Sequence, residues 1–316
     1  MKIITNGLIR QLALPATQYV AWVRESFLMK HTAQLPPKLS VHPRGSDFFN
    51  TMPCLLPEDY GRFGVKVVHR IDGAVPSLGS HILLYSTVSG QLLALLDGDI
   101  ITSMRTGAVA TLAIQTLRNS AAEPVYGLVG LGNTCRATLL CLLESEPDTM
   151  HHVALLEYKD QARLFEERFA GYGNVSFTRV ESREELARRS DVLVSCITAA
   201  HCNFCDDADA YKPGCTIVPV HTRGFQNCDT VFDKVFGDDT GHVCNFRYFN
   251  EFRSFTELSD VLAGRKPGRE RADERILSYN VGLGLHDVLI ASRIYEMVKD
   301  MAPEMSMPKE TEKFYV

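Results

Sequence analysis

The stretch VYGLVGLGNTCRATLL, residues 125–140, constrains the fold of this chain more than any other segment. It opens with β-branched and aromatic residues, passes through closely spaced glycines and continues into an apolar run with helical spacing. This order predicts a strand, a tight turn and a helix, because glycine permits the backbone conformations that a tight turn requires. Glycine-rich turns are common, so the meaning of this one depends on the segments around it.

Strand-like and helix-like segments alternate from residue 102 onward. A run of small and apolar residues at 102–119 predicts a helix that precedes the glycine turn. The alternation that follows predicts a parallel, doubly wound sheet. The predicted strands are PVYGLVG (124–130), HHVALLEY (151–158), NVSFTRV (174–180), DVLVSCIT (191–198) and CTIVPV (215–220), and the predicted helices run from the turn to Ser145, over 159–173 and over 182–190.

The region before residue 102 has a different pattern. Residues 12–34 have helical spacing, and the Pro-rich segment QLPPKLSVHPRG (34–45) predicts extended chain. With the strands that follow, this region predicts a small mixed sheet with flanking helices. The whole chain is therefore expected to be an α/β protein: a Rossmann-type doubly wound parallel sheet plus a second, mixed α+β domain. The strands predicted here are GVKVVHR (64–70), HILLYST (81–87) and QLLALLDG (91–98), with a hairpin at Ser89-Gly90 between the last two.

Composition excludes several classes of protein. The chain has 316 residues, 45% hydrophobic and 22% charged, which is typical of a globular protein with two domains of ordinary size. Its net charge of −5 offers no basic face, so no nucleic-acid partner is expected. No apolar run reaches the roughly 18 residues of a membrane helix, and MKIITNGLIRQLALP lacks the apolar core of a signal peptide. We therefore expect a cytoplasmic protein without membrane association.

The nine cysteines are scattered without regular spacing, as in proteins of a reducing compartment. The one close pair, Cys202 and Cys205, follows His201, but no second pair supplies the remaining ligands of a structural zinc site. We expect free thiols in a loop and no bound metal.

Its alternating context makes the glycine turn a candidate dinucleotide-binding site. Gly130 and Gly132 would let the backbone approach a pyrophosphate, and the helix N-terminus would supply N–H donors and a positive dipole. The third motif position is Cys135 in place of glycine. Glu157 closes the next strand, where a carboxylate holds the adenosine ribose and favours NAD over NADP; Lys159 weakens that preference. The alternative is an ordinary α/β turn.

The segment ITSMRTGAVATLAI (101–114), followed by GLVGLGNTCRA (127–137), resembles the ornithine cyclodeaminase/μ-crystallin family of NAD(P)-dependent proteins. The resemblance implies a Rossmann domain, residues 113–287, beside a substrate-binding and dimerisation domain, residues 1–112 with 288–316, and hence a homodimer. Because members include cyclodeaminases, amino-acid dehydrogenases, ketimine reductases and a hormone-binding crystallin, the fold alone does not select a reaction. Further segments in the family's order are GVKVV (64–68), SGQLLALLDG (89–98), ELSDVLAGRKPGR (257–269) and VGLGLHDVLIASRIYE (281–296).

The resemblance also implies roles for individual residues. Lys66 matches the family lysine beside the nicotinamide and the substrate carboxylate, where a partly desolvated amine can transfer a proton. Arg44 and Arg105 resemble two carboxylate-binding arginines, since a guanidinium binds a carboxylate through two parallel hydrogen bonds. The alternative for each is an ordinary exposed charge. The residues expected to bind the cofactor are Thr106, Gly130, Gly132, Asn133, Thr134, Glu157 and Thr198.

The chain departs from the cyclodeaminases after the fifth predicted strand. Those proteins carry an aspartate in a Gly-Gly-Asp-Cys-Pro-Gly segment, whereas this chain has VPVHTRGFQNCD (218–229). If Arg223-Gly224 aligns with Pro-Gly, His221 takes the place of the aspartate, and Asp229 lies too far along. A carboxylate attracts the distal ammonium of ornithine, whereas a histidine repels it or is neutral. His221 is therefore assigned a catalytic role, proton transfer with an imine nitrogen or a hold on a side-chain carboxylate; the alternative is a loop histidine without one.

These observations predict an NAD(P)-dependent oxidoreductase that transfers hydride to or from the α-carbon of an amino or imino acid, as an opine-type amino-acid dehydrogenase or a ketimine reductase. NAD is the expected cofactor, with NADP as the alternative, and a small amino or imino acid is the expected ligand. The run 254–287 resembles the opine-type branch, whose larger substrates carry several carboxylates that Arg44, Arg105 and Arg223 would suit. The helix Asp287–Lys299 is expected to return to the substrate domain. Two alternatives stay open: an ornithine cyclodeaminase that recycles its NAD internally, and a crystallin-like protein that binds cofactor and ligand without turnover.

Overall fold

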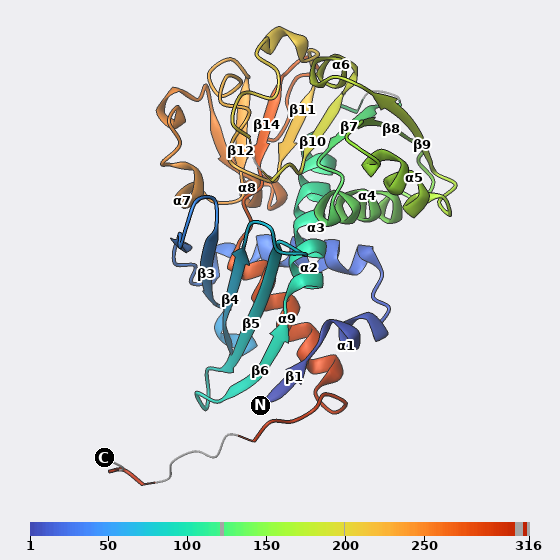
Figure 1. Ribbon diagram of the computed structural model, residues 1–316. Coiled ribbons are helices and arrows are strands. Elements are labelled where there is room, and N and C mark those ends of the chain that lie inside the picture. The colour runs from blue at the N-terminus through green and yellow to red at the C-terminus, as the bar shows by residue number, and fades with distance from the viewer. Residues whose placement is uncertain (121–122, 199, 307–311, 315–316) are drawn as a thin grey trace. The chain divides into compact units, whose positions relative to one another are not determined.

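The computed structural model describes residues 1–120, 123–198, 200–306 and 312–314 (Figure 1). The chain groups into two compact units. Unit 1 comprises Met1–Ala13, His31–Thr102 and Asp287–Val316, and unit 2 comprises Leu14–Lys30 and Ser103–His286. The domain boundaries expected from the sequence, 1–112 with 288–316 and 113–287, stay a prediction.

The described part of unit 1 is built on a six-stranded mixed sheet in the order β1-β6-β5-β4-β3-β2. Strands β2 to β6 pair antiparallel, and β1 joins β6 in parallel. The three strands predicted in this region are confirmed as β4, β5 and β6, and Gly90 has a positive φ of 66° in the predicted hairpin. The strands are β1 (Lys2–Ile4), β2 (Leu39–Val41), β3 (Phe48–Leu55), β4 (Arg62–Arg70), β5 (Leu78–Ser86) and β6 (Leu92–Asp97).

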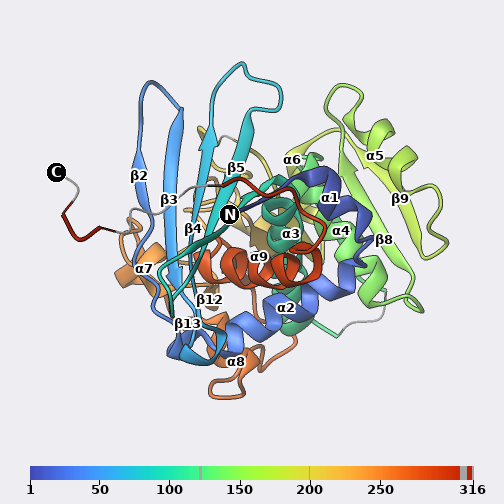
Figure 2. The same ribbon diagram turned by 90° about the horizontal axis from the view of Figure 1, so that it is seen from below.

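Strand β4 turns one face to the interior of unit 1, because buried Gly64, Lys66 and Val68 alternate with less buried residues. The helix α9 (Gly284–Val298) packs on this face from Asp287 onward (Figure 2). A Cβ atom on Gly64 would lie 2.8 Å from Cγ2 of Val288, so the helix approaches β4 this closely only because residue 64 has no side chain. The helix begins at Gly284 rather than at the expected Asp287, which places Asp287 in its first turn.

The described part of unit 2 is built on an eight-stranded parallel sheet in the order β13-β12-β14-β11-β10-β7-β8-β9. The five predicted strands are present as β7 to β11, which confirms the Rossmann-type doubly wound sheet. The chain order reverses at β7, with β8 on one side and β10 on the other, and ligands bind beside such a reversal at the carboxyl edge of the sheet. The strands are β7 (Val125–Val129), β8 (His151–Leu156), β9 (Val175–Val180), β10 (Val192–Ser195), β11 (Thr216–Pro219), β12 (Lys234–Gly237), β13 (Phe255–Glu257) and β14 (Ile276–Tyr279).

Helices or 3₁₀ turns connect most of the parallel strands of unit 2. The helix α3 (Asp99–Leu117) enters the unit at Ser103 and packs closely on α4 (Asn133–Ser145), since a Cβ on Gly107 would lie 2.5 Å from the backbone of Ala137. Among the described residues, no helix combines the length and the apolar character needed to cross a membrane. The remaining helices of unit 2 are α2 (Ala16–Leu28), α5 (Gln161–Phe169), α6 (Arg183–Arg189), α7 (Thr240–Val243) and α8 (Leu258–Leu262), with 3₁₀ turns η3 (Ala208–Ala210) and η4 (Phe249–Glu251).

The helix predicted over residues 12–34 is wrong in extent. Within that range the chain forms α2 and the 3₁₀ turn η1 (Lys30–Thr32), and the separate helix α1 (Asn6–Gln11) ends before it. Pro15 explains the break, because a proline lacks the N–H that a helix interior needs and stands here at the N-cap of α2. Ala13, two residues before Pro15, has a positive φ of 46°, which lies outside the right-handed helical region.

Candidate active site

The glycine turn between β7 and α4 has two glycines with different functions. Gly130 has a φ of 76°, and a Cβ there would lie 2.5 Å from the backbone of Cys196, so only glycine allows the turn to approach the end of β10. Gly132 is the N-cap of α4, and a Cβ there would meet nothing within 4 Å. Gly132 therefore leaves open space in front of the helix N-terminus, whose first N–H groups have no partner within the helix.

A pocket of about 620 Å³ lies at the carboxyl ends of β7, β8 and β10. It brings together four of the seven residues predicted to bind the cofactor, Gly130, Gly132, Glu157 and Thr198. Apolar wall residues, the glycine backbone and a carboxylate at the rim suit an adenine, a pyrophosphate and a ribose respectively. The other three predicted residues lie elsewhere than in the described lining of this pocket: Asn133 and Thr134 in the first turn of α4, and Thr106 in α3.

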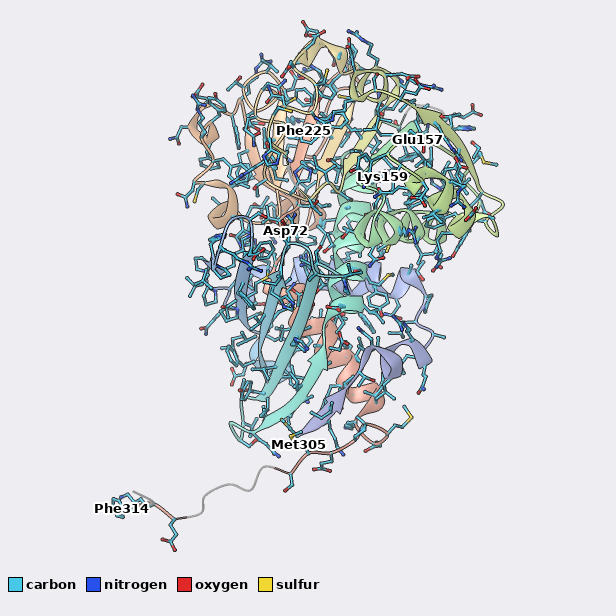
Figure 3. All side chains as sticks on the ribbon, in the orientation of Figure 1. Asp72, Glu157, Lys159, Phe225, Met305 and Phe314 are labelled. Carbon is cyan, nitrogen blue, oxygen red and sulfur yellow. The ribbon has the colours of Figure 1, made fainter. Side chains whose placement is uncertain are left out.

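Glu157 follows β8 at the rim of the pocket, with Lys159 close by (Figure 3). One carboxylate oxygen of Glu157 is 3.4 Å from Nη1 of Arg179, whose stronger contact, 2.7 Å, is with Glu166. Lys159 has a positive φ of 55°, and its ammonium lies over the ring of Tyr158 at 5.2 Å from the centroid. The carboxylate of Glu157 therefore keeps acceptor capacity toward the pocket.

Lys66 and Asp287 form a buried ion pair in unit 1. Nζ of Lys66 on β4 is 2.6 Å from Oδ2 of Asp287 in the first turn of α9, and both side chains are 0% exposed. An acidic residue in a first helical turn also interacts favourably with the positive end of the helix dipole. Burial, and then the charge of Asp287, raise the pKa of the Cys54 thiol to about 12, so this neighbour stays protonated. The pair fixes an ammonium in a site shielded from water.

The two arginines predicted to bind a carboxylate differ in environment. Arg44 in unit 1 is 76% exposed, and its Nε donates to Oδ2 of Asp47 at 2.9 Å. A hydrogen bond from the backbone N–H of Asp72, followed by the contact with Arg44, lowers the pKa of Asp47. Arg44 thus belongs to an exposed loop with its own carboxylate partner.

Arg105 lies in α3 of unit 2 and is buried. Its guanidinium packs against Gly282, where a Cβ would lie 1.9 Å from Nη1. Gly282 has a φ of 89°, and its N–H donates to Oδ2 of the buried Asp238. Gly282 is therefore required both by its backbone conformation and by the space that Arg105 occupies.

His221 follows β11 and is hydrogen-bonded through Nε2 to Oγ of Ser195 at 2.7 Å. Ser195 is fully buried at the carboxyl end of β10. Burial lowers the pKa of His221 to about 4, although a hydrogen bond with the Arg223 backbone acts in the opposite direction. The imidazole is therefore neutral near pH 7. Of the two states expected from the sequence, a cation that repels the ammonium of ornithine and a neutral ring, the structure favours the neutral ring.

Sequence reasoning missed three residues of these arrangements. Ser195, Asp287 as the partner of Lys66, and Asp238 behind Gly282 all have partners far away in the chain. Two local signals could have found Ser195 and Asp287. Ser195 is a polar residue inside the apolar strand DVLVSCIT, and Asp287 closes the glycine-rich segment VGLGLHD. Nothing in the local pattern links Asp287 to Lys66.

Comparisons with known proteins agree with this architecture. A family model described as the ornithine cyclodeaminase/mu-crystallin family matches residues 11–302. The nodulation efficiency protein NfeD of Rhizobium meliloti is 24% identical over 278 residues, 84% of this chain and 85% of the relative. A Δ(1)-pyrroline-2-carboxylate reductase of Colwellia psychrerythraea is 28% identical over 244 residues, 72% of this chain and 75% of the relative. The Δ(1)-pyrroline-2-carboxylate reductase of Thermococcus litoralis, solved with NADH and L-proline, has the same fold, with a TM-score of 0.84 at 23% identity, covering 96% of this chain and 100% of that one.

Proposed function

Because the chain belongs to the ornithine cyclodeaminase/mu-crystallin family, we propose that it is an NAD(P)-dependent oxidoreductase that transfers hydride to or from the α-carbon of an amino or imino acid. The observation that carries the proposal is the pocket that joins Gly130, Gly132 and Glu157 at the carboxyl edge of the parallel sheet. Relatives named as reductases of a cyclic imino acid support the same class of reaction.

In this proposal unit 2 holds the cofactor. The backbone at Gly130 and Gly132 and the N-terminus of α4 bind the pyrophosphate, and Glu157 accepts hydrogen bonds from the adenosine ribose. A carboxylate there repels a 2′-phosphate, so NAD is the proposed cofactor. When bound, the nicotinamide supplies or accepts the hydride. Thr198 borders the same pocket, and Thr106, Asn133 and Thr134 are retained as further proposed contacts.

Lys66 and Arg105 are the proposed ligands of the substrate α-carboxylate. A buried ammonium fixed by Asp287 and a buried guanidinium fixed against Gly282 are both preorganised for an anion. Lys66 also holds a proton at Nζ that it can share with the reacting nitrogen. Arg44 is retained as a third proposed contact, which would require its exposed pair with Asp47 to open.

The neutral His221 favours a dehydrogenase or reductase over a cyclodeaminase. A neutral imidazole bound to Ser195 does not attract a distal ammonium, as the aspartate of the cyclodeaminases does. It can instead accept a hydrogen bond from the substrate or exchange a proton with an imine nitrogen. The proposed reaction is thus the opine-type dehydrogenase or ketimine reductase reaction, with net consumption or production of NADH.

An absorbance assay with ammonia measured in the same wells tests the proposal. Purified protein is supplied with NADH or NADPH and a panel of cyclic imino acids and 2-oxo acids with amines, and separately with NAD and amino acids. Net cofactor oxidation or reduction supports the proposal. Ammonia released from ornithine at constant cofactor would make the protein a cyclodeaminase, and tight cofactor binding without any turnover would make it a binding protein.

Two further features belong to the proposal. A homodimer is proposed on the ground of family membership, and sedimentation of the purified protein tests it. A cytoplasmic location is proposed because all nine cysteines are described as free thiols, as expected in a reducing compartment.

A further inference from the structure

A second pocket, of about 790 Å³, lies in unit 2 and has its own lining. Its residues belong to the segments that follow β10, β11 and β12, among them Asn203, Arg223, Asn245 and Arg247. Segments that follow the carboxyl ends of parallel strands are the usual place for ligands in a doubly wound sheet. The proposed cofactor contacts leave this pocket without a function.

The lining of this second pocket carries more positive than negative charge. Arg223 and Arg247 supply two guanidinium groups, against the single carboxylate of Asp206, whose Oδ1 already accepts from Nδ2 of Asn203 at 3.1 Å. Among the residues that the structure describes, neither arginine has a carboxylate within ion-pair distance; Arg247 packs over the ring of Tyr248 at 5.0 Å. Both guanidinium groups keep their hydrogen-bond donors for a ligand.

Several other exposed arginines of unit 2 are paired with carboxylates. Arg163, Arg179 and Arg188 each form an ion pair with a glutamate at 2.6–2.8 Å. An arginine whose neighbours are arranged to satisfy it needs no external anion. Among the described residues, Arg223 and Arg247 lack such partners, as do Arg168 and Arg183, but Arg223 and Arg247 line one pocket together, where both can bind an anionic ligand.

The segments that carry this pocket are tied to one another. The N–H of Phe204 donates to the carbonyl of Gly224 at 2.6 Å, and the rings of Phe204 and Phe225 stack with centroids 5.5 Å apart. Within the second segment, Nε2 of Gln226 donates to the carbonyl of Thr222 at 2.8 Å. Arg223 therefore projects from a fixed loop, and less entropy is lost when a ligand binds.

The same segments continue from residues assigned to the reaction. Thr222 follows His221 directly, and the His221 ring lies 6.1 Å from that of Phe225. On the other segment, Thr198 borders the cofactor pocket and Ala200 borders the second pocket. A substrate handled by His221 can thus extend a distal group along this loop.

We propose that the second pocket binds a distal carboxylate of the substrate, so that the amino or imino acid is an acidic one. This inference rests on the proposed function and names the substrate class within it. A planar carboxylate matches the paired donors of Arg223 or Arg247, and the amide of Asn245 adds a neutral donor. In this proposal the second pocket binds the end of the substrate opposite to the α-carboxylate.

Calorimetric titration of the full-length protein saturated with NADH tests this substrate class without turnover. The probes are 2-oxoglutarate and 2-oxovalerate, which share a carbon chain and differ in the distal carboxylate. Wild type is expected to bind 2-oxoglutarate about tenfold or more tightly than 2-oxovalerate, since a charge-assisted hydrogen bond contributes at least that factor. Arg223→Met combined with Arg247→Met is expected to remove the preference and leave 2-oxovalerate binding unchanged. Arg163→Met, an exposed arginine on α5, is the matched control and should keep the preference.

The outcomes separate this inference from the proposed function. Equal affinities in wild type, no binding of 2-oxoglutarate, or a preference that survives the double variant would each overturn the acidic-substrate class. None of these results bears on hydride transfer itself, which the turnover assay measures over its whole panel of imino acids, 2-oxo acids and amino acids. Saturation with NADH precedes the titration with the two probes. If the protein does not bind NADH at that stage, the result counts against the proposed function instead.

Discussion

Lys66 and Asp287 lie far apart in the sequence and form an ion pair with no exposed surface. Removing two charges from water costs free energy that their attraction offsets only when the geometry is good, so such a pair is weak evidence for stability. The loss of one partner, in contrast, leaves the other charge buried without compensation. A functional role accounts better for the pair, because it keeps an ammonium at a fixed point of β4.

Substitution of this pair separates activity from stability. Lys66→Met is expected to abolish turnover and to lower the free energy of unfolding by about 3–5 kcal/mol, because Asp287 loses its partner. Lys66→Met with Asp287→Leu removes both charges and should recover most of the stability without activity. Urea unfolding and NADH-linked turnover measure the two effects. Lys2→Met, at the exposed pair with Glu304, is the control and should change stability by at most about 1 kcal/mol. Unchanged stability of Lys66→Met would contradict a buried charged pair.

The half-buried imidazole of His221 makes the folded state less stable in mild acid. Burial lowers the pKa of His221 to about 4 in the folded protein, whereas a histidine in an unfolded chain has a pKa of roughly 6.5. As the pH falls below about 6.5, the unfolded chain binds the proton first. The stability linked to this group is therefore complete above that pH and decreases as the pH falls toward 4.

Between pH 7 and pH 5, this group is expected to lower the free energy of unfolding by about 2 kcal/mol. His221→Gln lacks the titrating ring, so its unfolding free energy should fall by about that much less over the same interval. Urea denaturation at the two pH values gives both differences. The exposed His81→Gln is the control and should keep the wild-type difference. If the unfolding free energy of His221→Gln fell between pH 7 and pH 5 by as much as that of wild type, the ring would not be held neutral in the folded protein.

At the scale of elements, the sequence predicts those parts of the fold whose signal is local. Strands β7 to β11 are predicted because apolar runs alternate with amphipathic helices, and the tight turn is predicted because its glycines are adjacent. Strands β12, β13 and β14 escape prediction, since they are short and separated by long irregular segments. The dinucleotide site at Gly130 and Gly132 is predicted because its glycines and the flanking strand and helix are adjacent in the sequence. The pairs Lys66–Asp287 and His221–Ser195 form only when distant elements pack, so no local pattern predicts them.

The β7–α4 turn offers a matched pair of glycine substitutions. Gly130→Ala forces a side chain into a positive φ and against the Cys196 backbone, so it should cost at least about 1–2 kcal/mol of stability and abolish NADH binding. Gly132→Ala adds a methyl group to open space at a φ of −82° and should stay within about 0.5 kcal/mol of wild type. That methyl group still stands where the pyrophosphate would lie, so NADH affinity should fall. Urea unfolding and NADH fluorescence titration measure these effects, and equal stability of the two variants would contradict the assigned strain.

In the whole molecule, segments that are far apart in the sequence belong to the same compact unit. Unit 1 is assembled from three separate stretches of sequence and unit 2 from two, because the chain passes from one to the other in α3 and returns in α9. Hydrophobic periodicity predicts the helices and strands, but it does not predict to which unit each of them belongs. Helix α2, for example, belongs to unit 2 although it lies near the N-terminus. All described residues that border the cofactor pocket lie in unit 2, so cofactor binding should stabilise that unit directly.

NADH is therefore expected to raise the melting temperature. At about 100 times its Kd, a ligand that binds only the folded state adds about 2.7 kcal/mol, which corresponds to a shift of several degrees for a protein of this size. NADPH at the same concentration should raise the melting temperature less, because the Glu157 carboxylate repels its 2′-phosphate. Glu157→Gln should narrow the difference between the two cofactors, while Glu167→Gln, an exposed glutamate on α5, should preserve it. Differential scanning fluorimetry over a range of cofactor concentrations measures these shifts. A larger shift with NADPH than with NADH would reverse the assigned cofactor, and no shift with either would remove the pocket beside Gly130 as a dinucleotide site.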